Sequence, residues 1–127
     1  MKSIVEHSAR QAFALPGLEH RTTAGRADGL SSLEVWVQTV DAGAETPVHS
    51  HDCDEAVVIL EGSGRLIADG ETAHFAADQT LCVPAGVVHQ IINDGTGPIR
   101  LIGALSATPP GTFAADGSPM ELPWDQK

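Results

Sequence analysis

The chain has 127 residues, enough for one compact domain and too few for two separate cores, so we expect a single domain over residues 1–127. Its 17 acidic residues outnumber its 7 basic ones and give a formal net charge of −10, which argues against a nucleic-acid partner because phosphate groups are held by clusters of Lys and Arg. No apolar run is long enough for a signal peptide or a membrane span, so we expect a cytosolic protein with no membrane partner.

The first part of the chain is expected to form edge strands, followed by one longer strand. Hydrophobic residues make up 42% of the chain, and 13 Gly and 8 Pro supply many turns, a mixture that favours short strands. Within residues 1–29 we predict edge strands at Ser3–Glu6 and Glu19–Thr23. Residues Leu30–Val40 predict a long strand with two faces: Leu33, Val35 and Val37 on one, and Glu34, Trp36, Gln38 and Val40 on the other.

The core of a barrel or sandwich is expected within about residues 30–105. The continuous apolar run Ala56–Leu60 is typical of a strand covered on both faces, and in so small a protein this favours a partner subunit. Asp69-Gly70 is a strong signal for a two-residue hairpin turn. Further strands are predicted at Arg65–Ala68, Glu71–Phe75, Thr80–Val83, Val88–Asn93 and Ile99–Leu105. Turn signals thus recur roughly every 8–12 residues, the spacing of an all-β sandwich or barrel.

The last segment, residues 106–127, is rich in Pro and Gly and is predicted to be an extended tail without a helix. It carries four large apolar side chains, which indicate that it packs on something: Phe113, Met120, Leu122 and Trp124. The sequence leaves open whether the tail covers its own barrel or a neighbouring subunit. Together with the apolar run Ala56–Leu60, the tail predicts a homodimer, the commonest closed assembly.

The residues with the clearest chemistry are His49, His51 and Glu55, which fall within seven positions of the chain. Side chains alternate along a strand, so His49 and His51 point the same way and can grip one ion together. A turn at residues 52–54 breaks the counting before Glu55, so its inward direction is a hypothesis. His89 follows a Pro-x-Gly turn on a different strand and is expected to supply a fourth ligand.

The remaining histidines and the cysteines have no partners in the sequence. We expect His7, His20 and His74 to be ordinary core or surface groups, although His74 is the one further histidine of the central stretch that could act as a base. The two cysteines form no CxxC pair, so free thiols are expected. Cys53 is interpreted as a loop residue and Cys82 as a small buried hydrophobe.

Two spaced motifs resemble those of the cupin superfamily. The first motif, G(X)5HXH(X)3-4E(X)6G, is matched at every defined position by Gly43, His49, His51, Glu55 and Gly62. The second, G(X)5PXG(X)2H(X)3N, is matched by Pro84, Gly86, His89 and Asn93, while its opening glycine is Asp78 here. That departure alters a turn and leaves every ligand in place.

The resemblance implies an all-β fold, the double-stranded β-helix or jelly-roll barrel, in which one divalent transition metal ion is bound. Its ligands would be His49, His51, Glu55 and His89. Imidazole and carboxylate suit Fe, Mn, Ni, Zn and Cu alike, so the identity of the metal stays open. If Glu55 points inward then so do Val57 and Ile59, and if His89 does then so does Ile91, which predicts a mostly apolar cavity. Two further side chains of one strand face, Trp36 and Gln38, either line its mouth or face solvent or a partner.

Three functions are compatible with such a site. The first is a metal-dependent enzyme that acts on a small apolar organic molecule, most simply by a dioxygenase-type oxidation. The second is a redox-neutral isomerase, lyase or hydrolase in which the ion is a Lewis acid. The third is a small-molecule-binding protein without catalysis. No catalytic residue is assigned, and the roles of Trp36, Gln38, Cys53 and His74 stay open.

Overall fold

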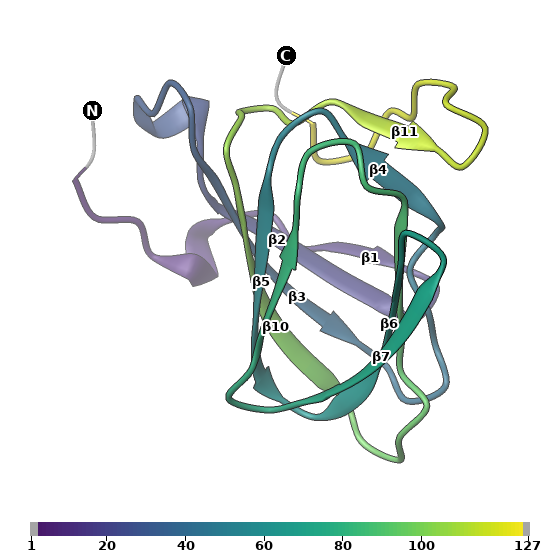
Figure 1. Cartoon of the computed structure of the whole chain (residues 1–127). Coiled ribbons are helices and arrows are strands. Elements are labelled where there is room, and N and C mark those ends of the chain that lie inside the picture. The colour runs from purple at the N-terminus through teal and green to yellow at the C-terminus, as the bar shows by residue number, and fades with distance from the viewer. Residues whose placement is uncertain (1–2, 126–127) are drawn as a thin grey trace.

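Two antiparallel β-sheets face each other in the computed structural model, which describes residues 3–125 (Figure 1). Within those residues one sheet has six strands, in the order β1 (Phe13–Leu15), β2 (Leu18–Ala24), β3 (Glu34–Val40), β10 (Ile99–Leu105), β5 (Glu55–Glu61) and β8 (Thr80–Val83). The other has five, in the order β11 (Thr112–Ala114), β4 (His49–His51), β9 (His89–Ile92), β6 (Ser63–Ala68) and β7 (Glu71–Ala76). Two short 3-10 helices, η1 (His7–Ala9) and η2 (Arg26–Asp28), lie in the N-terminal part. The expected all-β jelly roll is confirmed.

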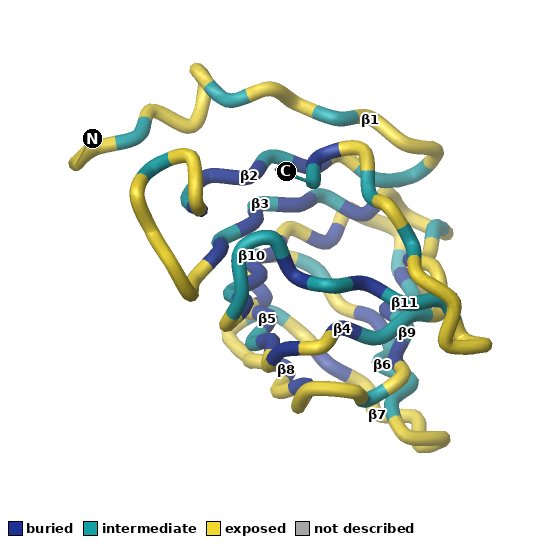
Figure 2. The backbone as a smooth tube through the Cα atoms, turned by 90° about the horizontal axis from the view of Figure 1, so that it is seen from above, coloured by how far each residue is buried: buried dark blue, intermediate teal, exposed yellow. Residues whose placement is uncertain are grey.

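Alternation along the strands builds the core between the two sheets. On β3 the inward face is the one that carries Trp36 and Gln38, and every second residue from Glu34 to Val40 is buried. The strand therefore begins at Glu34, later than the predicted Leu30. Apolar side chains from both sheets meet in one cluster: Val40, Val57, Ile59, Phe75, Leu81, Ile91, Ile99 and Leu101. Figure 2 shows the buried positions along the strands and the exposed ones along the connecting loops.

The hairpin turn predicted at Asp69-Gly70 is present. Ala68 pairs with Glu71 across it, and both turn residues have positive φ, 52° at Asp69 and 76° at Gly70, as a two-residue hairpin requires. Asp78, which replaces a motif glycine, also has a positive φ of 68°. Asp is one of the few other residues that enter this region at low cost, so the turn keeps its shape without Gly.

The N-terminal part differs from the prediction. Ser3–Glu6 forms no strand, because the real edge strand is β1, a short hairpin partner of β2. The second predicted strand is confirmed, since β2 covers Glu19–Thr23. Among residues 3–125 no helix is long and apolar enough to cross a membrane. The cytosolic location stays a prediction.

The C-terminal tail packs on its own barrel. Its strand β11 pairs with β4, and Trp124 is 6% exposed in a cluster with Trp36, Cys53 and Leu105. No helix occurs in residues 106–125, as expected. The tail therefore packs in cis, as part of the same domain.

Of two expectations about outward-facing residues, one stays a prediction and the other was wrong. Within the run Ala56–Leu60 the inward residues Val57 and Ile59 are buried, whereas Val58 and Leu60 are 37% and 46% exposed in the single chain, so their cover by a partner subunit stays a prediction. Cys82 is exposed, because on β8 it occupies the parity opposite to the buried neighbours on either side. Cys53 is a loop residue, as interpreted, and is buried; both thiols are free.

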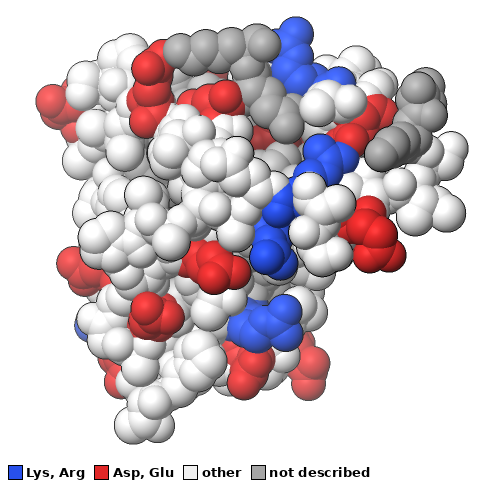
Figure 3. Space-filling model, turned by 180° about the vertical axis from the view of Figure 1, so that it is seen from behind, with Lys and Arg blue, Asp and Glu red and all other residues white. Residues whose placement is uncertain are grey.

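On the face shown in Figure 3, acidic side chains are dispersed among uncharged ones instead of forming a single patch. This distribution is typical of a solvated surface.

Candidate metal centre

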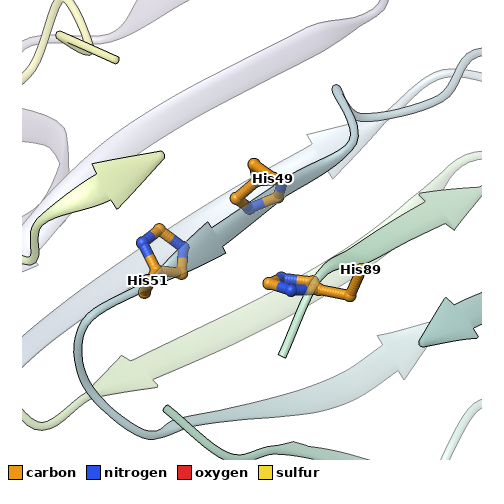
Figure 4. A group of neighbouring side chains, drawn as sticks. All are labelled: His49, His51 and His89. Atoms are coloured by element: carbon orange, nitrogen blue, oxygen red, sulfur yellow. The ribbon is translucent and has the colours of Figure 1, made fainter. Parts of the chain in front are cut away.

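Three histidines converge from two neighbouring strands of the five-stranded sheet (Figure 4). His49 and His51 occupy alternate positions of β4, and His89 opens β9 directly opposite His49 in the register. One ligand atom from each of the three lies within 4.8 Å of the other two. This spacing is short enough for one ion to contact all three rings.

The rings of His49 and His89 are fixed in the same way. The Nδ1 of His49 lies 2.7 Å from the carbonyl oxygen of Pro47, and the Nδ1 of His89 lies 2.9 Å from that of Val87. A carbonyl oxygen only accepts, so each Nδ1 carries the hydrogen. In the neutral form of either ring the lone pair is therefore on Nε2, the form of imidazole that binds a metal.

His51 is fixed by the C-terminal tail. Its Nδ1 lies 3.3 Å from the carbonyl oxygen of Gly111, which precedes β11, and 3.1 Å from the hydroxyl oxygen of Thr112, the first residue of β11. The carbonyl again requires the hydrogen on Nδ1 and leaves Nε2 free. Among the described residues the Nε2 atoms of His51 and His89 are buried and make no hydrogen bond of good geometry, although the Glu55 carboxylate lies near both. Buried nitrogens without a good hydrogen bond are costly, and a bound metal ion would satisfy both.

Glu55 approaches the histidines from the other sheet. It opens β5, is 9% exposed, and places its Oε1 3.3 Å from the Nε2 of His89 and 3.8 Å from that of His51. The neighbouring Gly103 leaves room for it, since a Cβ there would lie 3.3 Å from the Glu55 Oε2. The hypothesis that Glu55 points inward is confirmed, while the role of all four residues as metal ligands stays a prediction.

Electrostatics keeps these groups in forms suited to an ion. Burial, helped by the charge of His89, lowers the pKa of His49 to about 4, and burial likewise lowers the pKa of His51. Burial would lower the pKa of His89, but its contact with Glu55 outweighs this and raises it. Burial would raise the pKa of Glu55, but the histidines lower it. At neutral pH His49 and His51 are thus neutral, and an ion would compete only with the proton shared near Glu55.

A cavity of about 70 Å³ lies beside the cluster. Trp36 and Gln38 line it, which settles their direction as inward. The remaining lining is mostly apolar, as expected, and comes from both sheets, including β1 and β2, and from the tail. These residues are Leu15, Leu18, Thr46, Pro47, His49, His51, Glu55, Val57, His89, Ile91, Leu101, Thr112, Met120, Leu122 and Trp124. The cavity therefore joins a polar end, formed by the histidines and Glu55, to an apolar wall.

The flanking segments add an aromatic cluster that the sequence did not reveal. The ring of His20 stacks on Trp124, with centroids 3.7 Å apart and planes at 12°, and meets the edge of Trp36 at 5.0 Å. Its Nε2 contacts the Thr22 hydroxyl at 2.8 Å, and its Nδ1 contacts the Gln38 amide nitrogen at 2.9 Å. Burial lowers the pKa of His20 to about 3. His20 is thus a satisfied core group, and alternation along β2 was the signal for its inward direction.

His74 does not belong to this site. It lies exposed on β7, opposite Arg65, with its neighbour Phe75 pointing into the core. The parity of the strand turns His74 away from the barrel, so the idea that it serves as a base is wrong.

Two facing antiparallel sheets with a His-x-His pair, a nearby Glu and a histidine from a second strand define a jelly-roll barrel of the cupin class. The family model described as "Cupin domain" matches residues 36–105, and the chain belongs to the cupin family.

Curated relatives include auxin-binding protein 1 of Arabidopsis thaliana, which is 34% identical over 76% of this chain and 54% of that protein. Auxin-binding protein T85 of Nicotiana tabacum is 30% identical over 84% of this chain and 64% of that protein. The chain thus spans about half to two thirds of the length of these relatives.

Among solved structures, the polyketide cyclase RemF of Streptomyces resistomycificus is similar with a TM-score of 0.74 at 19% identity, over 98% of this chain and 89% of that one. A Bacillus subtilis oxalate decarboxylase has a TM-score of 0.77 at 18% identity, over 87% of this chain and 31% of that one. At such identities the likeness concerns the fold alone.

Proposed function

We propose that this chain binds one divalent transition metal ion through His49, His51, Glu55 and His89 and holds a small organic molecule in the adjacent cavity. The observation that carries the proposal is the shared tautomer of the three histidines. Each Nδ1 is held by an oxygen acceptor, so three Nε2 atoms are available beside a buried carboxylate. When bound, the ion would supply a Lewis acid and a binding position for an anionic oxygen.

The chain's own residues define what the molecule must be like. The cavity wall is mostly apolar and includes the rings of Trp36 and Trp124, with centroids 5.8 Å apart, while the histidines and Glu55 supply its titratable groups. A flat aromatic molecule with one acidic group matches both ends. The auxin-binding relatives support this choice of class.

The present volume of about 70 Å³ holds a few water molecules and is well below the ~300 Å³ at which pockets for small organic ligands begin. Entry of such a molecule therefore requires side chains of the wall to move. Met120, Leu122 and Trp124 belong to the tail, which joins the sheets through the three-residue strand β11. Only three residue pairs of β11 with β4 hold this strand in its sheet.

Calorimetric titration tests the proposal in two steps, first with Co²⁺ or Zn²⁺ on chelator-treated protein and then with indole-3-acetate on the metal-loaded protein. We expect one metal site per chain and binding of the acid that depends on the metal. E55Q, which removes a charge but keeps the shape, should weaken metal binding, and E61Q on the exposed end of β5 should not. A wild-type chain that binds no metal would contradict the proposal.

The second candidate is the dioxygenase-type oxidation of such a molecule. An apolar cavity bordered by three histidines and Glu55 favours it, because four protein ligands leave room for a further ligand on an ion that accepts six. Oxygen consumption by the iron-loaded protein with phenols, flavonols and diketones is the measurement. Turnover with zinc and without oxygen would select the redox-neutral alternative, and recovery of unchanged ligand would select a binding protein.

We also propose that two copies associate through the outer face of the six-stranded sheet. Val58 and Leu60 on β5 are exposed there, and exposed apolar side chains grouped on one face favour association. Light scattering at micromolar concentration should give the mass of a dimer, and L60K should give that of a monomer. V48K, at an exposed position just before β4 of the other sheet, is the matched control. A monomeric wild type would contradict this proposal.

A further inference from the structure

Glu34 is a buried carboxyl with no part in the metal cluster. It opens β3, is 1% exposed, and uses both of its oxygens. The indole Nε1 of Trp36 donates to Oε2 at 2.6 Å, and the hydroxyl of Thr108 donates to Oε1 at 2.8 Å. Burial raises the pKa of Glu34, while these two hydrogen bonds oppose the rise. A carboxyl buried so deeply is costly, and the two bonds offset that cost.

Of the two hydrogen-bond partners of Glu34, Trp36 is the one that belongs to the candidate site. The Trp36 ring lines the cavity and meets the ring of His51 edge-on, with centroids 5.7 Å apart and planes at 72°. It also meets His20 and Trp124 at near-perpendicular angles. The indole has a single polar atom, Nε1, so the hydrogen bond to Glu34 fixes how the ring plane is turned.

The other partner ties the same carboxyl to the flanking segments. Thr108 lies between β10 and β11, and its hydroxyl also accepts the backbone N–H of Arg26 at 2.9 Å. Gly25 allows this close packing, since a Cβ there would lie 3.2 Å from the Glu34 Oε1 and 3.1 Å from the Thr108 hydroxyl. Glu34 therefore joins the wall of the cavity to the start of the tail.

We propose that Glu34 is a positioning residue: its carboxylate holds the Trp36 indole against His51 and thereby shapes the aromatic wall that a bound molecule meets. The role deepens the proposed function and rests on it for the ligand, while the orientation of Trp36 is a property of the metal-free chain. Glu34 acts through Trp36 and touches neither the metal ligands nor the cavity.

The substitution E34Q keeps the size of the side chain but leaves one oxygen and introduces a donor, so it cannot accept from both partners. We expect a changed tryptophan band in near-ultraviolet circular dichroism of the metal-free protein. We expect indole-3-acetate to bind about tenfold more weakly to the metal-loaded protein, and the affinity for Co²⁺ to stay within about threefold. E19Q, at an exposed position on β2, should match the wild type in all three measurements.

A second pair of variants separates positioning from general stability. T108V removes the hydrogen bond to Oε1 and the one that Thr108 accepts from the Arg26 backbone, but it leaves the bond between Glu34 and Trp36 in place. It should therefore lower the melting temperature while leaving the tryptophan band and the affinity for the acid as in the wild type. W36F deletes the indole N–H and should lower that affinity as E34Q does, with no further loss in the double variant. If E34Q does not fold, the affinities of W36F and T108V for the acid test the positioning role.

Unchanged acid affinity in W36F, or a tryptophan band in folded E34Q equal to that of E19Q, would overturn the positioning role. If the wild type binds neither Co²⁺ nor the acid, the proposed function fails, and the circular dichroism of the metal-free variants still decides the role of Glu34.

Discussion

The barrel core and the two flanking segments contribute different halves of one site. The core, residues 36–105, supplies the histidines, Glu55 and part of the apolar wall, whereas β1–β2 and the tail supply the rest of that wall. The metal end is built on strands that pair on both sides, while the wall is closed by a tail attached through β11. The comparison indicates that affinity for the ion and affinity for the organic molecule can be altered separately.

The largest expected effect is the loss of the metal site in the core. H89A removes one of three converging nitrogens and leaves Glu55 without its nearest partner, so the affinity for Zn²⁺ or Co²⁺ should fall about a thousandfold, equivalent to about 4 kcal/mol. H74A, on the exposed side of β7, is the matched control and should bind as the wild type does. Calorimetric titration measures both. Equal affinities would show that His89 is not a ligand.

The next effect concerns the wall. W124A removes a buried ring that stacks on His20 and contacts Trp36, so the free energy of unfolding should fall by about 3 kcal/mol, the usual cost of deleting a large aromatic side chain. Affinity for Co²⁺ should stay within about threefold, and binding of indole-3-acetate should weaken. Denaturant unfolding and calorimetry give the two numbers. W124F should recover most of the stability, and a matching loss of metal affinity would break the comparison between core and wall.

The same division explains what could be predicted from the sequence. Alternation and turn residues placed most strands of the core, and Thr80–Val83 and Ile99–Leu105 agree with the structure at both ends. The spacing of the His-x-His pair brought the histidines together because a strand repeats every two residues. Where residue type was used in place of strand parity, as for Cys82, the prediction was wrong.

The wall was harder to predict because its residues meet through packing between distant parts of the chain. Trp124 reaches His20 only when the tail folds back over the barrel, and the tail has no periodic pattern that would show this. Likewise Thr112 becomes a partner of His51 through the pairing of β11 with β4. Local patterns specify the direction of a side chain, while the docking of a Pro- and Gly-rich segment depends on the surface it finds.

A third prediction concerns pH and the wall. The pKa of His20 is lowered by burial from 6.5 to about 3, so between these values the unfolded chain binds a proton that the folded chain does not. The stability that depends on a neutral His20 is complete above pH 6.5 and is lost as the pH falls, by about 1.4 kcal/mol per pH unit. Denaturant unfolding from pH 7 to pH 5 should show H20Q with a correspondingly smaller slope than the wild type. An equal slope in H20Q would refute the prediction.

The smallest expected effect tests a hydrogen bond between the tail and a histidine of the core. Thr112 belongs to the tail, yet its hydroxyl lies 3.1 Å from the Nδ1 of His51, on the side of the ring opposite Nε2. T112V keeps the shape of the side chain and removes this partner, leaving the more distant Gly111 carbonyl at 3.3 Å to orient the ring. Because the groups that orient a metal-binding histidine commonly change affinity by about tenfold, we expect that loss for Co²⁺, about 1.4 kcal/mol.

T46V, whose hydroxyl accepts the backbone N–H of Ile91 and touches no histidine, should alter stability but not metal affinity. If T112V binds Co²⁺ as tightly as the wild type, the tail closes the cavity without affecting the affinity for the metal, and the two halves are independent. A tenfold loss would show that a movement of the tail, such as entry of a ligand requires, changes the metal affinity through His51.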